Sequence, residues 1–296
     1  MLRNLITILF ALAGLCLSAQ NFDILQERLD RYVSGKQASI GICVIADSKD
    51  TVSVNSSKMF PMMSVFKFPA AMAFSRQCQK QDLSFEDSTC IDLKKLPADT
   101  YSPMLKDFCD KDSVALTYIS LLDYSLSKSD NNACDIILEK TGGPEAVDSF
   151  LDSLGFSDIN ILWTEDDMHK DMNRFFENNA TPVAMACLLD YFDTECNDPF
   201  SMQIKTLMEN CKTGTDRLAA PLQNTQAVLG HKTGTGGRMP DGKTVGINDA
   251  GYVHLPDGRR YVIAVFITDS DYTAEETSAI IAGISETVYN FMLESD

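Results

Sequence analysis

The chain has 296 residues, of which 45% are hydrophobic and 23% are charged, and its formal net charge is -17. This composition is that of a globular protein and excludes a disordered or fibrous one. No cluster of Lys or Arg interrupts the acidity, so nucleic-acid phosphates and anionic lipid headgroups would be repelled and a small molecule is the expected partner.

The first residues have the pattern of an export signal. A basic residue stands near the start, residues 5–17 are apolar but too short to span a bilayer, and Ser18-Ala19 offers small residues for cleavage. We therefore expect residues 1–19 to be a signal peptide and the mature protein to be periplasmic, without a membrane anchor. Lipidation of Cys16 is an alternative, but a small residue would be expected directly before a lipidated Cys, and Leu15 is large.

Eight cysteines follow this segment, an even number in a compartment that permits disulfides, but the sequence does not determine their pairing. We expect small core residues or structural bridges. No two cysteines are spaced as C-x-x-C, and the histidines (His169, His231 and His254) are scattered along the chain. Neither a metal site nor a cofactor is therefore expected.

The predicted elements begin with a helix over residues 22–33, whose apolar residues recur at helical spacing before Gly35 ends it. Two strands follow, over residues 38–46 and 51–54, joined by a polar turn. From residue 64 to about 207 the pattern is mostly helical.

The C-terminal part returns to strands. Three are predicted near residues 227–233, 246–255 and 260–267, and then a helix in which Thr273 and Glu276 have capping-box spacing. The order helix, strands, long helical segment, strands, helix predicts an α+β fold, with an antiparallel sheet covered by the terminal helices and a helical region inserted between strands. Any binding cleft is expected where the two parts meet.

The segment FPMMSVFKFPA, residues 60–70, places Ser64 and Lys67 three positions apart, on one face of a helix. A Ser hydroxyl is a weak nucleophile unless a base lies beside it, and a desolvated Lys can be that base. The alternative is a helix-capping Ser followed by a Lys whose stem lies along the core. By itself, S-x-x-K does not decide between the two.

Two further segments favour catalysis. Ser129-Asp130-Asn131 stands just before a helical run, and Lys232-Thr233-Gly234 stands at the end of a strand. In this order, S-x-x-K, S-D-N and K-T-G are the signature of class A β-lactamases and penicillin-binding proteins. A second K-T-G, at residues 212–214, follows a helical run instead of a strand and is assigned no catalytic role.

The chain thus resembles the class A serine β-lactamases over essentially all of its mature length, and in several details their PER-type and CfxA-type branch. The resemblance implies a five-stranded antiparallel sheet flanked by terminal helices, formed by residues 20–60 and 212–296. It implies an all-helical domain of residues 61–211 with an Ω-loop at about 162–179. The implied activity is hydrolysis of the β-lactam ring of cephalosporins and penicillins, which confers antibiotic resistance, by a monomer that favours cephalosporins.

The resemblance also assigns roles to residues. Ser64 would form the acyl-enzyme, with Lys67, or Glu165 through a water, removing its proton. Ser129 would pass a proton to the lactam nitrogen, and Glu165 would activate the water for deacylation. The backbone N–H groups of Ser64 and Thr235 would form the oxyanion hole. The residues implied in substrate binding lie around the cleft: Asn131, Lys232, Thr233, Gly234, Thr235, Tyr101 at the cleft edge, and Arg217 pointing into it.

The predicted Ω-loop departs from the family pattern. His169 and Asp135 stand where the family usually has Asn, and Trp163 and Asn178 occupy the positions of an Arg and an Asp that commonly form a salt bridge across the neck of the loop. That salt bridge is therefore expected to be absent. The conformation of the loop, and the groups that hold the water, stay open at this point.

Two other classes of protein share the first three motifs. A D,D-peptidase acting on peptidoglycan would lack a working Glu165 and would form a long-lived penicilloyl adduct. A β-lactam sensor would do the same and would normally carry a membrane anchor. We therefore predict a β-lactamase, with these two as alternatives.

Overall fold

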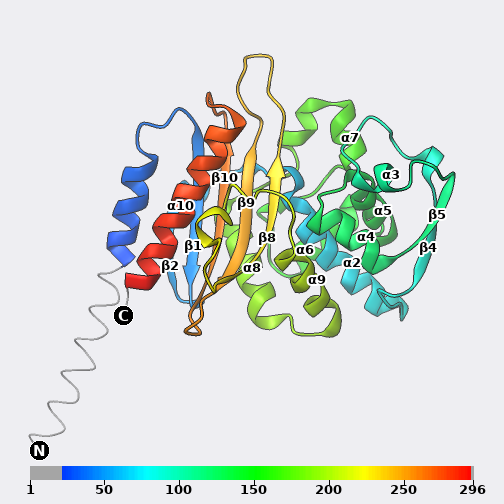
Figure 1. The fold of residues 1–296 in the computed structure, drawn as a ribbon, viewed down its shortest axis with the longest axis horizontal. Helices are drawn as coiled ribbons and strands as arrows, with labels where there is room; N and C mark the ends of the chain where they lie inside the picture. The colour runs from blue at the N-terminus through cyan, green and yellow to red at the C-terminus, as the bar shows by residue number, and fades with distance from the viewer. Residues whose placement is uncertain (1–21, 295–296) are drawn as a thin grey trace, which may run out of the picture.

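A five-stranded antiparallel sheet forms the centre of one half of the protein (Figure 1). The computed structural model describes residues 22–294, so the predicted signal peptide lies outside the described residues. The strand order is β2 (Asp50–Val54), β1 (Ser39–Ala46), β10 (Arg260–Thr268), β9 (Ile247–His254) and β8 (Val228–Thr235). The predicted fold class is confirmed, and each predicted strand is present to within two residues at either end.

Helices cover both faces of the sheet. The N-terminal helix, residues 22–33, and α10 (Ala274–Glu294) lie on one face, where alternate strand residues such as Ile42 and Val44 pack against them (Figure 1). The residues between these, Cys43 and Ile45, belong to the core on the other face. Because successive side chains of a strand point to opposite faces, burial of both faces requires strands that are apolar almost throughout.

The predicted capping box of the last helix is present. Thr273 Oγ1 accepts a hydrogen bond from the Glu276 N–H at 3.1 Å, and the Glu276 carboxylate accepts one from the Thr273 N–H at 2.8 Å. These two bonds satisfy backbone donors that the helix itself leaves unpaired.

The segment between β2 and β8 contains most of the helices. The α-helices are α2 (Lys67–Gln81), α3 (Pro103–Asp107), α4 (Tyr118–Leu122), α5 (Asn131–Thr141), α6 (Pro144–Ser153), α7 (Glu165–Lys170), α8 (Pro182–Glu195) and α9 (Pro199–Glu209). Shorter helical turns are η1 (Met63–Phe66), η2 (Leu93–Lys95), η3 (Asp123–Ser127), η4 (Met172–Phe176) and η5 (Ala220–Leu222).

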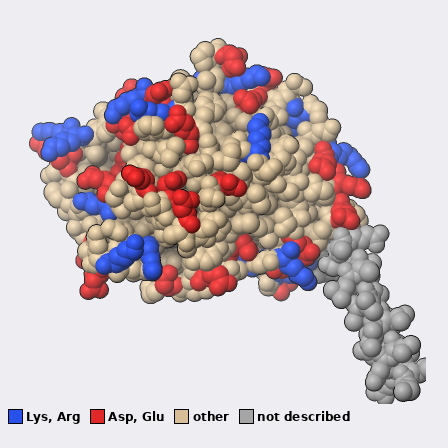
Figure 2. Space-filling view, turned by 180° about the vertical axis from the view of Figure 1, so that it is seen from behind, with Lys and Arg blue, Asp and Glu red and all other residues tan. Residues whose placement is uncertain are grey.

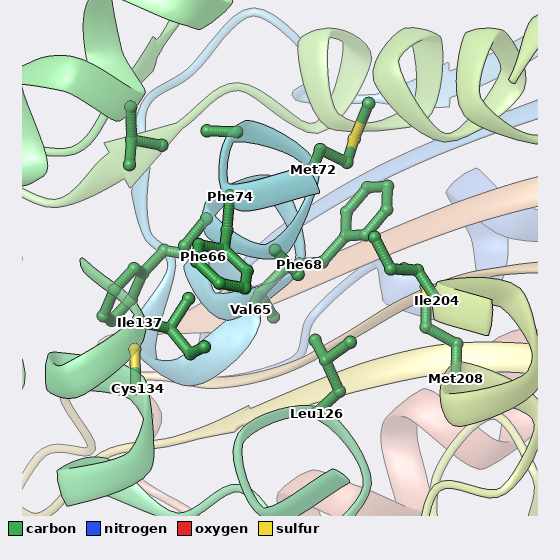
Figure 3. Close-up of a cluster of buried hydrophobic side chains, with 14 of the residues drawn as sticks. Val65, Phe66, Phe68, Met72, Phe74, Leu126, Cys134, Ile137, Ile204 and Met208 are labelled. Atoms are coloured by element: carbon green, nitrogen blue, oxygen red, sulfur yellow. The ribbon is translucent and has the colours of Figure 1, made fainter. Parts of the chain in front are cut away.

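Helix α2 is buried among the others. Figure 3 shows Phe66, just before the start of α2, and Phe68, in its first turn, among apolar side chains from other helices, including Cys134 of α5 and Ile204 of α9. Each fully buried aromatic side chain stabilises the fold by about 2–3 kcal/mol. This packing fixes the start of the helix, which carries the S-x-x-K motif, relative to the rest of the protein.

The inserted region is not all helical, which corrects the expectation for residues 61–211. β4 (Ser88–Asp92) pairs with β5 (Ser113–Thr117), and β7 (Asn179–Ala180) pairs with both β3 (Phe60–Pro61) and β6 (Ile159–Asn160). These strands are two to five residues long, too short for their periodicity to stand out in the sequence. The domain limits near residues 60 and 212 stay a prediction.

The eight cysteines within residues 22–294 are all free thiols, so the expectation of structural bridges is wrong for this part of the chain. Cys43, Cys78 and Cys134 are buried core residues. Within the same residues, no helix combines the length and the apolar character needed to cross a membrane.

Candidate active site

Ser64 lies in η1, directly before α2, in a turn held under strain. Met63, the residue before it, has a φ of 49°, in the left-handed region that costs a residue with a side chain about 1–2 kcal/mol. Strand β8 packs closely against this turn, since a Cβ at Gly234 would lie 2.5 Å from the Met62 carbonyl oxygen. A side chain at position 234 would push the strand away, so the glycine of the K-T-G motif sets how near Ser64 and β8 approach each other.

Lys67 Nζ is completely buried and has three acceptors. It lies 2.9 Å from Glu165 Oε1 and donates to Asn131 Oδ1 at 2.6 Å and to the Ser129 carbonyl oxygen at 2.8 Å. The Ser64 hydroxyl donates to the same Glu165 Oε1 at 3.3 Å. The amine and the hydroxyl therefore meet on one carboxylate oxygen, which brings three predicted catalytic residues together.

The S-D-N motif connects the two lysines of the site. Ser129 has a φ of 60°, and Asp130 caps α5 by accepting the Ala133 N–H at 2.8 Å. Asp130 is completely buried, which raises the pKa of its carboxyl although several hydrogen bonds oppose the shift. Lys232 Nζ donates to Ser129 Oγ at 2.9 Å, while Lys67 contacts the Ser129 carbonyl.

Tyr101 is held at the rim of the site by the same motif. Its carbonyl accepts the Asn131 N–H at 3.0 Å, and Asp130 accepts bonds from the neighbouring Ser102 hydroxyl and Met104 N–H. The Tyr101 side chain is 53% exposed. The predicted position at the cleft edge is where the structure places it.

Lys232 lies on strand β8, behind the residues that line the cleft. Lys232 is completely buried, and burial, together with the nearby charge of Lys67, lowers the pKa of its amine to about 8. Its Nζ donates to Ser129 Oγ and to the Thr233 carbonyl, each at 2.9 Å. The Lys232 amine therefore stands behind the cleft wall, beneath Ser129 and Thr233.

These side chains surround a cleft of about 410 Å³. Seven residues predicted for the site line it: Ser64, Tyr101, Ser129, Asn131, Glu165, Thr233 and Thr235. His169, noted in the sequence as a departure from the family's Ω-loop pattern, lines it too. Five more residues line it that the sequence did not single out: Met63, Phe175, Thr213, Gly236 and Gly237. A larger hollow of about 660 Å³ between α2, α6, α8 and α9 contains none of the predicted site residues.

Thr213 comes from the K-T-G sequence that was assigned no role. Its Oγ1 lies 2.6 Å from Thr233 Oγ1, whereas Lys212 beside it is exposed. The two K-T-G segments thus meet side by side through their threonines. No local pattern indicates this, because the contact joins residues 20 positions apart on different elements.

Arg217 does not point into the cleft, which corrects its predicted position. It is 7% exposed, and it donates to the Thr235 hydroxyl at 2.7 Å and to the carbonyls of Gly234 and Asn248 at 3.0 Å. Burial lowers the pKa of its guanidinium. Arg217 therefore holds Thr235 from behind the strand, and the hydroxyl of Thr235 is what faces the cleft.

Glu165 begins α7, and Asp135 fixes that helix end. The Asp135 carboxylate accepts the backbone N–H groups of Glu165 at 2.8 Å and Asp166 at 2.9 Å. Burial, followed by the charge of Glu165, raises the pKa of the Asp135 carboxyl to about 7. The side chains of Asp166 and Asp167 pair with Lys170 and Arg174, so Glu165 is the acidic residue of this helix that reaches the cleft.

The neck of the loop is tied by hydrogen bonds of Asn178. This residue is completely buried; its Oδ1 accepts the N–H groups of Leu162 at 2.8 Å and Trp163 at 2.9 Å, and its Nδ2 donates to the Trp163 carbonyl at 2.8 Å. The Arg174 guanidinium lies over the Trp163 ring, 4.0 Å from its centroid. Trp163 and Asn178, predicted to lack the usual salt bridge, therefore close the neck with uncharged groups.

Comparison with known proteins agrees with this geometry. The sequence profile of the Beta-lactamase enzyme family matches residues 24–292. A β-lactamase of Bacteroides uniformis is 38% identical over 96% of each chain, and the extended-spectrum β-lactamase PER-1 of Pseudomonas aeruginosa is 33% identical over 94% of this chain and 90% of its own. The crystal structure of a class A β-lactamase from Bacteroides cellulosilyticus superposes with a TM-score of 0.88 at 34% identity, covering 93% of this chain and 99% of that one.

The chain belongs to the β-lactamase enzyme family, and its fold is that of the class A enzymes. The resemblance inferred from the three motifs, including the likeness to the PER-type branch, is confirmed.

Proposed function

We propose that this chain hydrolyses β-lactam antibiotics through an acyl-enzyme formed on Ser64. The observation that carries the proposal is the meeting of Ser64 and Lys67 on the carboxylate of Glu165. A hydroxyl nucleophile next to a carboxylate and an amine has what acylation and ester hydrolysis both need, namely an acceptor for the hydroxyl proton and a base for water.

In the acylation step, Ser64 Oγ attacks the lactam carbonyl carbon. Lys67 Nζ has three hydrogen-bond acceptors around it, as many as a protonated amine has N–H bonds. This arrangement favours Glu165, directly or through a water, as the group that takes the Ser64 proton. The backbone N–H groups of Ser64 and Thr235 stabilise the tetrahedral intermediate, with each donor contributing about 3 kcal/mol.

Ring opening requires a proton on the lactam nitrogen. Lys232 donates to Ser129 Oγ, so the hydroxyl proton of Ser129 is free to point into the cleft. Ser129 therefore delivers the proton to the departing nitrogen. Its oxygen stays next to the Lys232 ammonium, which stabilises the negative charge that develops there. The proton that Glu165 took from Ser64 then passes to the Ser129 oxygen through the Lys67 amine, which contacts Glu165 and the Ser129 carbonyl, so Glu165 is again a carboxylate before deacylation.

The substrate carboxylate is bound along β8. The hydroxyls of Thr233 and Thr235 line the cleft, and the Lys232 charge lies directly beneath them. Arg217 acts here through Thr235, whose hydroxyl it positions. The Asn131 amide and Tyr101 complete the binding site at the opposite wall and at the rim.

In the deacylation step, Glu165 activates a water against the Ser64 ester. This step separates a β-lactamase from a D,D-peptidase or a β-lactam sensor, and the contact of Glu165 with Ser64 favours the β-lactamase. The test is incubation of the purified protein with a chromogenic cephalosporin. Repeated turnover without a persistent adduct supports the proposal, whereas one stoichiometric, long-lived adduct on Ser64 would support a peptidase or a sensor.

We further propose that the enzyme favours cephalosporins and has an extended spectrum, by analogy with the relative named an extended-spectrum β-lactamase. The N-terminal sequence pattern supports export and a periplasmic location. The acidic composition favours small-molecule substrates over nucleic acid, and on the face shown in Figure 2, Lys and Arg side chains lie in separate places among Asp and Glu. The enzyme is proposed to act as a monomer.

A further inference from the structure

The second K-T-G sequence, residues 212–214, lies between the S-D-N motif and strand β8, although the sequence alone indicates no role for it. The backbone N–H of Lys212 donates to the Ser127 carbonyl at 2.8 Å, and Ser127 lies two residues before Ser129. The Lys212 side chain is exposed and takes no part in this bond. The segment is therefore fixed at one end to the part of the chain that carries Ser129.

At its other end the segment packs directly on Thr233, and Gly214 makes this possible. Gly214 has a φ of 63°, in the left-handed region that favours glycine. A Cβ at this position would lie 2.4 Å from Thr233 Cγ2, so any other residue would push the segment away from β8. The glycine of the second K-T-G sequence therefore serves close approach to the threonine of the first.

The hydroxyl of Thr213 completes this approach with a short hydrogen bond. Within residues 22–294, Thr213 Oγ1 is the one atom hydrogen-bonded to Thr233 Oγ1, at 2.6 Å. The Cys211 thiol donates to the Thr213 carbonyl at 3.6 Å, and its sulfur lies 3.4 Å from Thr213 Oγ1. Because sulfur is a weak acceptor, the hydroxyl proton of Thr213 goes to Thr233 whenever Thr233 can accept it.

Both threonine hydroxyls of the cleft wall thus have a partner in the protein. Arg217 can only donate, so Thr235 accepts from it and keeps its own proton for the cleft. The bond between Thr213 and Thr233 can run in either direction in the free enzyme. When Thr233 donates to a bound carboxylate, Thr213 is the donor of the pair. The two hydroxyls then form a chain that ends on the substrate, in which each bond strengthens the other.

We propose that Thr213 is a positioning residue that, as the donor to Thr233, directs the hydroxyl proton of Thr233 toward the carboxylate of the substrate. The inference rests on the proposed β-lactamase function and gives the second K-T-G sequence a part in substrate binding. That part belongs to Thr213 and Gly214, whereas Lys212 contributes only its backbone. Thr213 acts through Thr233 in this account.

The test compares Thr213→Val, which keeps the shape and removes the hydroxyl, with Thr213→Ser, which keeps the hydroxyl. For a carboxylate-bearing cephalosporin, Thr213→Val should raise KM about three- to tenfold and leave kcat within about twofold, because the lost hydrogen bond serves substrate and transition state alike. Thr213→Ala should give the same rise, and Thr213→Ser should stay within about twofold of wild type. The control is Thr206→Val, an exposed threonine on α9. Thermal unfolding checks that each variant is folded.

A double-mutant cycle separates this role from a structural one. Thr233→Val removes the hydroxyl through which Thr213 acts, so adding Thr213→Val to it should raise KM by less than about twofold more. Three results would overturn the inference: the same rise in both backgrounds, an unchanged KM in Thr213→Val, or a Thr213→Ser variant as impaired as Thr213→Val. Absence of wild-type turnover would refute the proposed function itself, while normal wild-type turnover with any of these three results would refute this inference alone.

Discussion

The ammonium of Lys67 and the carboxylate of Glu165 form a buried ion pair, with 2.9 Å between Nζ and Oε1 and side-chain exposures of 0% and 6%. A carboxylate in this position can still accept a proton from Ser64 or from water, because its contact with Lys67 uses only part of its accepting capacity. Two of the catalytic steps proposed for this enzyme therefore depend on one side chain.

Replacement of Glu165 by Gln should impair deacylation more than acylation. Gln keeps the shape and can still accept from Lys67, but it is a far weaker base, so deacylation should slow by about 10²–10⁴-fold. Acylation still has Lys67 as an alternative base for the Ser64 proton, so a Ser64 adduct should accumulate with a good cephalosporin. Intact-protein mass spectrometry measures the adduct. Asp166→Asn and Asp167→Asn, whose carboxylates pair with Lys170 and Arg174, are the matched controls and should keep turning over. A trapped adduct in either control would show that the base had been assigned to the wrong residue.

Ser64→Ala should abolish turnover, with a loss of about 10⁴-fold or more, and leave the fold intact. The hydroxyl is half-buried and donates one hydrogen bond, to Glu165, so little stability depends on it. Thermal unfolding checks the fold. Peptide mapping of the wild-type protein after reaction with a slow substrate should find the adduct on the peptide that contains Ser64, and an adduct elsewhere would refute the assignment.

Lys232→Ala should reduce kcat/KM by about 10- to 100-fold, because it removes the charge beneath the carboxylate site and the donor to Ser129. Lys212→Ala, in the second K-T-G sequence, removes an exposed side chain and should change kcat/KM less than twofold. Steady-state kinetics of the two variants tests the choice between the motifs, and equal losses would mean that the choice was wrong.

Asp135 should make the unfolding free energy depend on pH. Its folded pKa, about 7, lies above the unfolded value of about 3.9, so the folded state holds a proton that the unfolded state releases between these values. The free energy of unfolding therefore decreases as pH rises through this range, by up to about 1.4 kcal/mol per pH unit. In Asp135→Asn, the free energy of unfolding measured with denaturant across this pH range should lack that pH-dependent contribution. The test compares slopes against pH, so it does not depend on how stable the variant is at any single pH. Asp166→Asn serves as the control, and a wild-type slope in Asp135→Asn would contradict the prediction.

Asn178→Ala should loosen the Ω-loop. It removes three hydrogen bonds from a completely buried residue and leaves the N–H groups of Leu162 and Trp163 without that partner, at a cost of about 2–4 kcal/mol. Hydrogen exchange should become faster across residues 162–179. Asn173→Ala, an exposed asparagine of the same loop, is the control and should leave exchange there unchanged. Unaltered exchange in Asn178→Ala would mean that the paired strands β6 and β7 hold the neck by themselves.

The sequence alone determined the strands of the sheet and the three motifs, and the resemblance to the class A enzymes that they indicate singled out Glu165 among its acidic neighbours. Alternation of apolar residues, capping patterns and motif spacing are relations between neighbours in the chain, so they can be read without a structure. The α+β order of elements followed from them, and so did the choice of Lys232 over Lys212, because one lies in a strand and the other after a helix. The very short strand pairs were missed for the opposite reason, since two residues contain no period.

The tertiary structure alone decided which side chains meet across the chain. Arg217 was predicted to face the cleft and instead holds Thr235 from behind, while Thr213, which had no predicted role, lines the cleft. The hydrogen bonds of Asn178, and the contact between His231 and Asp249, likewise connect residues that are far apart in the chain. Sequence spacing carries no information on such contacts, because they depend on how β8 packs against the turn before α2 and on the register between β8 and β9.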